Sequence, residues 1–425
     1  MIKRIFLLTF IAVGLSTYAQ SIGNSPYAAF GIGEVKYDNS VETNAMGGIN
    51  TAYVWDFNNS FNFKNPAANT NLELTSFRVQ VSNENQYFKS DFNNINVTKH
   101  STYLSNISIA FPLSKKLKFG FGYQPYSSKK YEILTTKLLA DNTTLKANRF
   151  FGEGTLNTIQ AAFGYQVNKD FALGFRSNFY FGKLSDIEEI TYTSADLVNG
   201  YETNNKIKTF NFTLGTTYQK KLKNDKKLTF GATYTFGTTG YLSTEYTNST
   251  YYYAGDIKVN HTTIEQSNSR DKNLIPKEFS IGVGYGHDGK WFASTQLDYK
   301  KGSTTQFLGK PFVYQDSYRI SAGGWYLPNY NDFRSYLNRV VYRYGVFYEK
   351  GSLNINNKNI NQYGVTAGVT LPFEKSNAVR MSGVELGIEL GRKGTLSNNL
   401  ILQNFFNVKI GINFADKWFQ KTVYQ

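Results

Sequence analysis

Hydrophobic and polar residues alternate along most of the chain after residue 71. Apolar side chains occupy nearly every second position of 171–181, 210–218, 279–285 and 384–390. A period of two with one apolar face is the pattern of a β-strand. No segment of comparable length keeps the 3.6-residue period of a helix. The sequence therefore predicts an all-β protein.

The length of the alternating segments separates two kinds of all-β protein. They are about ten residues long or longer, which is the span of a tilted transmembrane strand, whereas strands of soluble proteins average about five to six residues. Their second face carries Gly, Thr, Ser and Asn, which suits a wet lumen. Aromatic residues recur near their ends, as in the interfacial girdles of membrane barrels: Tyr123, Tyr126, Tyr165, Trp291, Tyr299, Trp325 and Tyr348.

The spacing of the segments predicts a 14-stranded antiparallel transmembrane β-barrel. Long loops are expected at 127–154, 183–207 and 237–275, alternating with short turns, and the short turns belong on the periplasmic side of an outer membrane. An even number of strands suits closure of a single-chain barrel. The predicted spans are 72–82, 101–111, 117–126, 155–166, 171–182, 208–219, 226–236, 276–287, 290–300, 316–326, 339–349, 361–371, 382–392 and 403–414.

The chain begins with a pattern typical of a secretory signal peptide, residues 1–19. Lys3 and Arg4 precede an apolar stretch of eleven residues, and Ala19 supplies the small residue at the cleavage position. The apolar stretch is too short to span a bilayer. At the other end, residues 415–425 are expected to form a periplasmic tail after the barrel, residues 72–414.

The composition limits the binding partners and the chemistry that can be expected of the protein. The 46 Lys and Arg outnumber the 31 Asp and Glu, and the formal net charge is +15. The basic residues are dispersed and the chain carries an export signal, so we expect no nucleic-acid partner; outer-membrane lipid and lipopolysaccharide are the expected anionic partners. With no Cys, three separated His and no catalytic motif, we expect no enzyme activity, metal site or cofactor.

Residues 20–71 do not alternate and are rich in small residues. A barrel of about 14 strands is too wide for its own side chains to fill, so it needs a plug or a channel. A Gly-rich segment ahead of the first span can pack closely inside such a tube. We therefore predict that residues 20–71 form an N-terminal hatch inside the lumen.

A short signature in this segment resembles a known family. Ala45-Met46-Gly47-Gly48, then Thr51-Ala52-Tyr53, then Lys64-Asn65-Pro66-Ala67-Ala68 is similar to the N-terminal signature of the long-chain fatty-acid transporter (FadL) family. The resemblance implies a 14-stranded outer-membrane barrel closed by a hatch, with passage of hydrophobic compounds by hatch rearrangement and a lateral opening at a kinked third strand. It also implies that the hatch includes Gly47, Gly48, Asn65, Pro66 and Ala67. The chain departs from the family at its end, because Val423-Tyr424-Gln425 replaces a terminal Phe.

The predicted registers also nominate residues of the lumen and the wall. In the third span, Gly120 and Gly122 face inward beside Pro125, which cannot donate a ladder hydrogen bond and should lie at a bulge, an edge or a break. We predict a lateral opening there; the alternative is that the span ends at Gln124 and Pro125 begins the long loop. Six inward polar residues either hold the hatch or bind a ligand carboxylate: Gln160, Arg176, Asn178, Arg343, Glu385 and Glu389.

Two functions from different classes follow. The first is passive uptake of hydrophobic small molecules, such as long-chain fatty acids, across the outer membrane. The second is a non-transporting barrel subunit of a multiprotein outer-membrane complex for secretion or assembly, with envelope proteins as partners. A lumen lined by apolar side chains near the hatch favours the first, and a sealed lumen with an unusually flat, aromatic external flank favours the second.

Overall fold

A computed structural model describes residues 23, 25–36, 40–54, 60–91, 95–141, 143–238, 242–271, 275–307, 310–332, 334–373 and 381–417. The predicted signal peptide and residues 418–425 lie outside these described ranges. No helix in the described part of the chain is long and apolar enough to cross a membrane.

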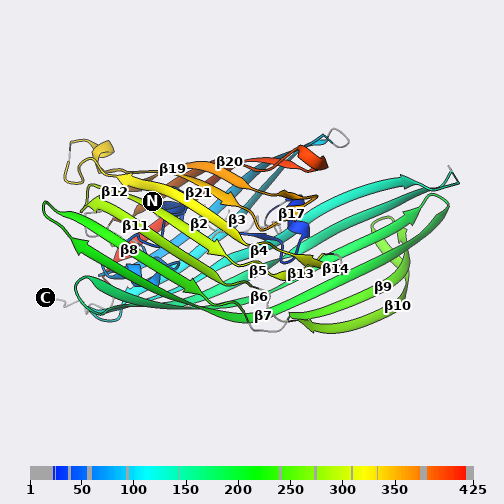
Figure 1. Ribbon diagram of the computed structural model, residues 1–425, viewed down its shortest axis with the longest axis horizontal. Coiled ribbons are helices and arrows are strands. Elements are labelled where there is room, and N and C mark those ends of the chain that lie inside the picture. Colours follow the sequence, from blue (N-terminus) through cyan, green and yellow to red (C-terminus); the bar gives the residue numbers. More distant parts are fainter. Residues whose placement is uncertain are drawn as a thin grey trace, which may run out of the picture.

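Fourteen strands of the described residues form one closed antiparallel barrel, in which the last strand pairs with the first (Figure 1). The predicted fold class and all 14 spans are thereby confirmed, since each span overlaps one strand. The barrel strands are β2 (Thr75–Ser90), β3 (Ile95–Pro112), β4 (Leu117–Leu138), β5 (Leu145–Gln166), β6 (Phe171–Tyr192), β7 (Ala195–Lys221), β8 (Lys226–Thr235), β11 (Glu278–His287), β12 (Trp291–Lys300), β15 (Ser317–Tyr326), β16 (Val341–Lys350), β19 (Gln362–Pro372), β20 (Gly383–Gly394) and β21 (Leu402–Asp416).

The alternation of the sequence sets the two faces of the wall. On β11, Phe279, Ile281 and Val283 point outward and are 41–44% exposed, as lipid-facing side chains are in a membrane barrel. The residues between them, Ser280 and Gly282, face inward. The same division holds along β6, β7 and β20, so that polar and small residues line the interior.

The wall is far longer on one side than on the other. β5 has 22 residues and β7 has 27, whereas β8 and β12 have ten each. The surplus forms a sheet that runs beyond the barrel end opposite the short turns (Figure 1). β9 (Leu242–Ala254) joins it by pairing with β7, and β10 (Ile257–Asp271) pairs with β9. We call this sheet, residues 129–154, 183–207 and 242–271, the strand extension.

The strand extension corrects one expectation. The long loops expected at 127–154, 183–207 and 237–275 are strands over most of their length. The physical reason is that these strands stand beyond the bilayer, where neither face needs to be apolar. Without lipid on one side, the apolar-polar alternation that revealed the membrane spans is lost.

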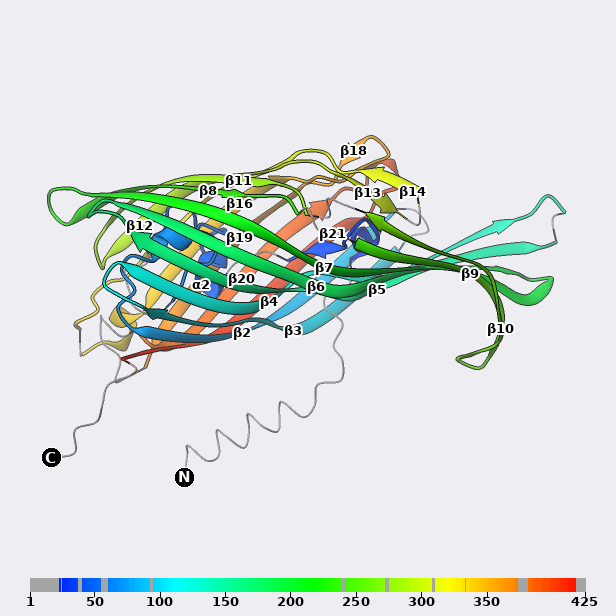
Figure 2. The ribbon, with the colours of Figure 1, turned by 90° about the horizontal axis from the view of Figure 1, so that it is seen from below.

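The described residues of 25–72, called the N-terminal segment below, lie inside the barrel (Figure 2, blue). Its elements are short: η1 (Pro26–Ala29), β1 (Glu34–Val35), α2 (Val41–Asn44) and η2 (Pro66–Asn69). The segment runs from the end that carries the strand extension toward the short-turn end, where it enters β2. Small elements at the rims complete the chain: β13 (Thr304–Phe307), β14 (Lys310–Val313), β17 (Asn354–Ile355), β18 (Lys358–Asn359), η4 (Tyr336–Arg339) and η5 (Ser397–Asn399).

Two apolar clusters hold the segment near the two ends of the lumen. At the short-turn end, Met46, Ile49 and Tyr53 pack with Phe292 and Trp325 of the wall. At the other end, Tyr27 packs against the rim cluster around Ile360 and Leu400. Buried apolar side chains of this size each contribute about 1.5–3 kcal/mol, so the segment is anchored at both ends of the tube.

Candidate functional site

Inward glycines of the wall lie where the N-terminal segment touches it. A Cβ atom added to Gly231 on β8 would lie 1.9 Å from the backbone oxygen of Thr51, and one added to Gly345 on β16 would lie 2.2 Å from the backbone of Met46. Real Cβ atoms do not come that close, so only glycine permits the contact. We call these positions the glycine belt: Gly120, Gly164, Gly174, Gly215, Gly231, Gly282, Gly323, Gly345, Gly368 and Gly387.

The glycine belt changes how the small inward residues of the wall are interpreted. The sequence suggested a wet lumen because the inner face carries Gly, Thr, Ser and Asn. At the belt the lumen is filled instead, because ten wall strands lack side chains there and the segment takes their place. Small inward residues in a barrel are therefore as consistent with a tightly seated segment as with a channel.

The residues predicted for the hatch lie in this segment and touch the wall. Gly47 has φ +75°, and its N–H donates to Thr366 Oγ1 at 2.9 Å. Asn65 is fully buried and donates to the carbonyls of Thr51 at 2.6 Å and Thr216 at 3.1 Å. Pro66 and Ala67 press against Gly164 and Gly174, and Gly48 borders the cavity described below.

Charged groups also bind the segment to the wall. Arg78 on β2 donates to Glu42 of α2 and to Ser60, and its guanidinium lies 3.7 Å from Glu385 on β20. Glu385 also accepts hydrogen bonds from Gln80 and Asn413. Buried charges are tolerated only when they are paired in this way. The cluster therefore ties α2 to two wall strands.

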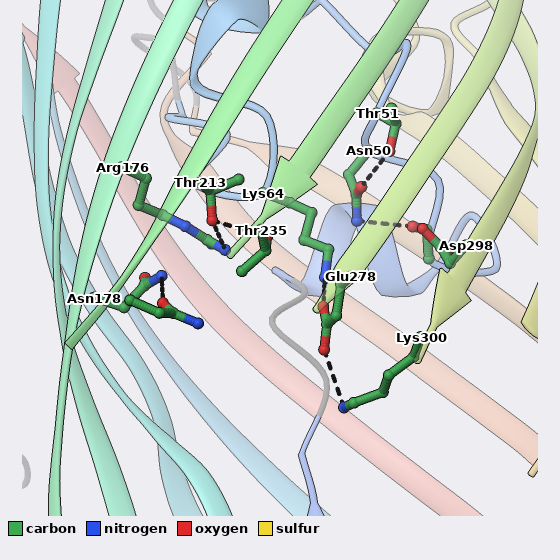
Figure 3. A network of polar contacts seen from close by, with 12 residues as sticks. Asn50, Thr51, Lys64, Arg176, Asn178, Thr213, Thr235, Glu278, Asp298 and Lys300 are labelled. Carbon is green, nitrogen blue, oxygen red and sulfur yellow. Dashed lines mark hydrogen bonds and ion pairs between the residues drawn. The ribbon is translucent and has the colours of Figure 1, made fainter. Parts of the chain in front are cut away.

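A second charged contact joins the segment to the opposite wall (Figure 3). Lys64 of the segment reaches Glu278 on β11 at 3.3 Å, and Lys300 on β12 reaches the same carboxylate at 3.0 Å. Nearby, the backbone N–H groups of Asn50 and Thr51 both donate to Gln296 on β12 at 2.9 Å. These contacts hold the segment from several directions at once.

The six lumen residues nominated from the sequence are all buried, but they fall into two groups. Gln160 donates to Asn178 at 3.3 Å, and Arg176 donates to Thr213 at 3.3 Å (Figure 3 shows the Arg176 contact). These three residues lie on β5 and β6. Across the barrel, Arg343 bonds Thr370 at 2.6 Å and Glu389 accepts from Asn44 of the segment at 3.1 Å; Glu385 belongs to the Arg78 cluster.

A cavity of about 310 Å³ borders the segment and the wall. Its lining includes three ion pairs: Lys36 with Glu84 at 2.7 Å, Lys393 with Glu34 at 2.8 Å, and Arg319 with Glu349 at 3.4 Å. An apolar part of the lining is formed by Ile32, Tyr126, Tyr180 and Ile275. Gln160, Arg176 and Glu389 border this cavity, whereas Asn178, Arg343 and Glu385 do not.

The backbone pairing of β3 and β4 stops beside that cavity, where the side-chain amide of Asn106 donates to Gln124 Oε1 at 3.3 Å. The β3–β4 ladder ends at the pair Ile107–Tyr123, although both strands continue. β4 extends to Leu138 and carries a register shift between Pro125 and Ser127. The span therefore does not end at Gln124, and Pro125 lies next to a bulge, one of the three positions expected for it.

The two glycines of this span do not leave open space. The ring of Phe61 lies 2.7 Å from the position of a Cβ on Gly120, and Phe63 lies 3.2 Å from that on Gly122. The inward bulk that these glycines lack is supplied by the N-terminal segment. Pro125 borders the cavity, and Gly120 and Gly122 do not.

Sequence reasoning missed the charged residues that hold the segment. On β2, Arg78, Gln80, Ser82 and Glu84 recur at every second position, which is a signal for an inward polar row. Of their partners, Lys36 binds Glu84 and Glu42 binds Arg78, and both partners lie in a part of the chain without periodicity. No pattern there indicates which side chain meets which wall strand.

Solved structures share this architecture. The toluene transporter TodX of Pseudomonas putida is 15% identical, with 90% of this chain and 99% of TodX covered and a TM-score of 0.57. A FadL homologue from Pseudomonas aeruginosa is 11% identical, with 90% and 98% covered and a TM-score of 0.57. No curated protein matches the chain at a significant level.

These likenesses define the class: the chain is a 14-stranded β-barrel of the Gram-negative outer membrane, with the fold of the FadL-like channels. Within that class, the chain belongs to the BamG family, which matches it over residues 1–425. The resemblance inferred from the N-terminal signature is confirmed for the fold. In the orientation of such barrels, the short turns face the periplasm and the strand extension faces the outside.

Proposed function

We propose that this barrel is a subunit of a multiprotein outer-membrane complex, a part of secretion or assembly machinery, and that it carries no flow of hydrophobic compounds. The observation that supports this most directly is the filled lumen. Ten wall strands contact the N-terminal segment through the glycine belt. The barrel then serves as an anchor that presents the strand extension outside the membrane.

The lining of the cavity supports the same proposal. Sites for hydrophobic ligands are mostly apolar, with a few polar groups that fix orientation. Here Lys36, Glu84 and Arg319 and their partners line the cavity next to the segment. A hydrophobic compound would displace water from these charges without offering a hydrogen bond, and that costs free energy.

The test is to isolate the tagged chain from native outer membranes in mild detergent. We expect it to migrate on a native gel as an assembly with fixed stoichiometry, and to show closed-channel behaviour in planar bilayers. A variant that lacks residues 242–271 shows whether the assembly depends on the strand extension. Two results together would contradict the proposal: the barrel is recovered alone, and cells that lack the barrel take up a hydrophobic compound less well.

A second candidate function is passive uptake of hydrophobic small molecules such as long-chain fatty acids. The early end of the β3–β4 ladder supports it, because the apolar part of the cavity, at Tyr126 and Ile32, lies beside that end. An opening there would release the compound sideways into the bilayer, where lipid and lipopolysaccharide surround the barrel.

Uptake of a labelled long-chain fatty acid by intact cells separates the two candidates. If the barrel is a channel, Pro125→Val should restore regular pairing at the bulge and slow uptake severalfold, while Lys220→Ala, at an exposed ion pair near the periplasmic turn, should leave it unchanged. Both variants must retain the heat-dependent gel shift of a folded barrel. If the barrel is a complex subunit, uptake is the same in all three strains.

A further inference from the structure

The end of the β3–β4 ladder leaves a strand edge that continues outside the membrane. Beyond Tyr123, β4 pairs with β5 on one side, in unbroken register from Ser127–Leu156 to Leu138–Leu145. On its other side, its only strand partner in the described residues is β1, which pairs at Ser127 and Ser128. From residue 130 to 138 this second side has no strand partner in the described part of the chain.

The contact with β1 indicates which backbone groups point toward the open side. The N–H of Lys36 donates to the carbonyl of Tyr126 at 2.7 Å, and Glu34 pairs with Ser128. Because donors and acceptors alternate along a strand, even-numbered residues of β4 direct their N–H and C=O to this side. Beyond the contact with β1 these include Leu134, Thr136 and Leu138; the leucine side chains are 64% and 50% exposed.

The N-terminal segment uses this edge only briefly because its chain turns away. Gly33 has φ +85°, and a Cβ there would lie 2.3 Å from the carbonyl oxygen of Ser128. The glycine permits both the close approach and the turn. An antiparallel strand thus already pairs with the first residues of the edge, and the later residues are left for another strand.

The opposite edge of the strand extension is built differently. β10 has two register shifts against β9, between Val259 and Thr262 and between Thr263 and Glu265. Bulges of this kind twist an edge and discourage added strands. The β4 edge has no such irregularity after Ser127, so of the two edges it is the one suited to pairing.

We propose that residues 130–138 of β4 take up an extended segment of a partner protein as an added antiparallel strand, and that this segment is acidic. The inference rests on the proposed function as a complex subunit. Charge supports the acidic character: Lys130 and Lys137 lie on β4, Lys146 on β5 and Lys99 on β3, against Glu153 and Asp141, while Glu132 and Glu189 are ion-paired with Arg149 within the sheet. Main-chain hydrogen bonds supply affinity in this mode of recognition, and side chains supply selectivity.

The test places a photo-crosslinking residue at Leu138 in cells that express the full chain, and compares wild type with Thr136→Pro and Thr136→Ala. Proline removes the outward N–H but leaves the bonds to β5, so the strand should persist at an edge. Loss of the donor and the clash of the ring should reduce the cross-link roughly tenfold. The alanine variant keeps the backbone and should remain at wild-type yield.

A charge reversal gives a second variant that does not alter the backbone. Lys130→Glu combined with Lys137→Glu should repel an acidic strand and lower the cross-link by a similar factor, while Lys130→Gln with Lys137→Gln should lower it less. Peptide mapping should place the cross-link in one extended, acidic stretch of the partner. A cross-link that persists in both Thr136→Pro and the charge-reversed chain overturns the inference.

The other outcomes separate this inference from the proposed function. If native gels show an intact assembly but no cross-link at Leu138, the chain is a subunit that does not use this edge. If the cross-link joins two copies of this chain, the occupant is a second copy and the acidic partner is wrong. If native gels show only a lone barrel, the proposed function itself fails.

Discussion

The four strands β4 to β7 run through the membrane and continue outside it. Comparing the two parts shows which features are caused by lipid and which by strand pairing. Inside the membrane, each of these strands has a lipid face and a lumen face, and Phe175 or Phe212 marks the lipid face at 40–44% exposure. Outside, the same strands keep their pairing without an apolar face. The hydrogen-bonded ladder is therefore common to both regions, and lipid explains the alternation.

The two regions also differ in how their edges are satisfied. Within the barrel, closure between β2 and β21 gives nearly every strand two partners. In the strand extension, β4 and β10 each have one side open in the described residues. Closed sheets leave no template for pairing, and open ones do. The barrel region is thus suited to stability and the extension to contact with other molecules.

Deleting residues 21–62 should have the largest effect on this comparison. The deletion removes most of the N-terminal segment from the glycine belt but spares every barrel strand. We expect an assembled barrel with a heat-dependent gel shift and a large rise in ion conductance in planar bilayers, because a 14-stranded tube is too wide for its own side chains to fill. Deleting residues 242–271 from the strand extension should leave conductance at the wild-type level. Equal conductance in both deletions would mean that the segment does not control the pore.

A matched pair of glycine variants should have the next largest effect. A side chain on Gly231 would meet the backbone of Thr51, whereas Gly255, in the turn of the β9–β10 hairpin, has nothing within 4 Å of an added Cβ. Overpacking of a filled site costs about 1–3 kcal/mol, so Gly231→Asn should lower the temperature at which the heat-dependent gel shift is lost. Gly255→Asn should not, because Asn tolerates the positive φ there. If both variants melt like wild type, the belt is not tightly filled.

Sequence alone predicted the barrel well because one physical rule governs it. Lipid on one side imposes alternation on every span, and Asp288-Gly289 marks a turn that the structure places between β11 and β12. The strands of the strand extension were not predicted, because water on both sides imposes no apolar-polar alternation. The contacts of Glu42 and Lys64 were not predicted for another reason. They join residues that are distant in sequence, and the N-terminal segment has no hydrophobic period from which a partner could be inferred.

The smallest predicted effect concerns how the β9–β10 hairpin is held in the strand extension. Glu189 Oε1 accepts hydrogen bonds from the hydroxyls of Tyr251 and Tyr253, each at 2.6 Å, and lies 3.4 Å from Lys258. Arg149 reaches the other oxygen at 3.2 Å. Burial alone would raise the pKa of Glu189, but these hydrogen bonds and the Lys258 charge outweigh it and hold the pKa below its usual range.

A lowered pKa means that ionised Glu189 stabilises the folded hairpin at neutral pH. This stabilisation is complete above the ordinary carboxyl pKa of about 4.3 and is lost as the pH falls through the lower value in the folded state. Glu189→Gln should remove about 1–2 kcal/mol at pH 7, seen as faster amide hydrogen exchange in residues 242–254. Expressed as protection factors, which remove the intrinsic pH dependence of amide exchange, the variant should change little on acidification, whereas wild type should approach the variant as the pH falls. Exchange in β8, which lies in the barrel wall, should stay slow in both proteins, and faster exchange there would show that the hairpin and the barrel open together.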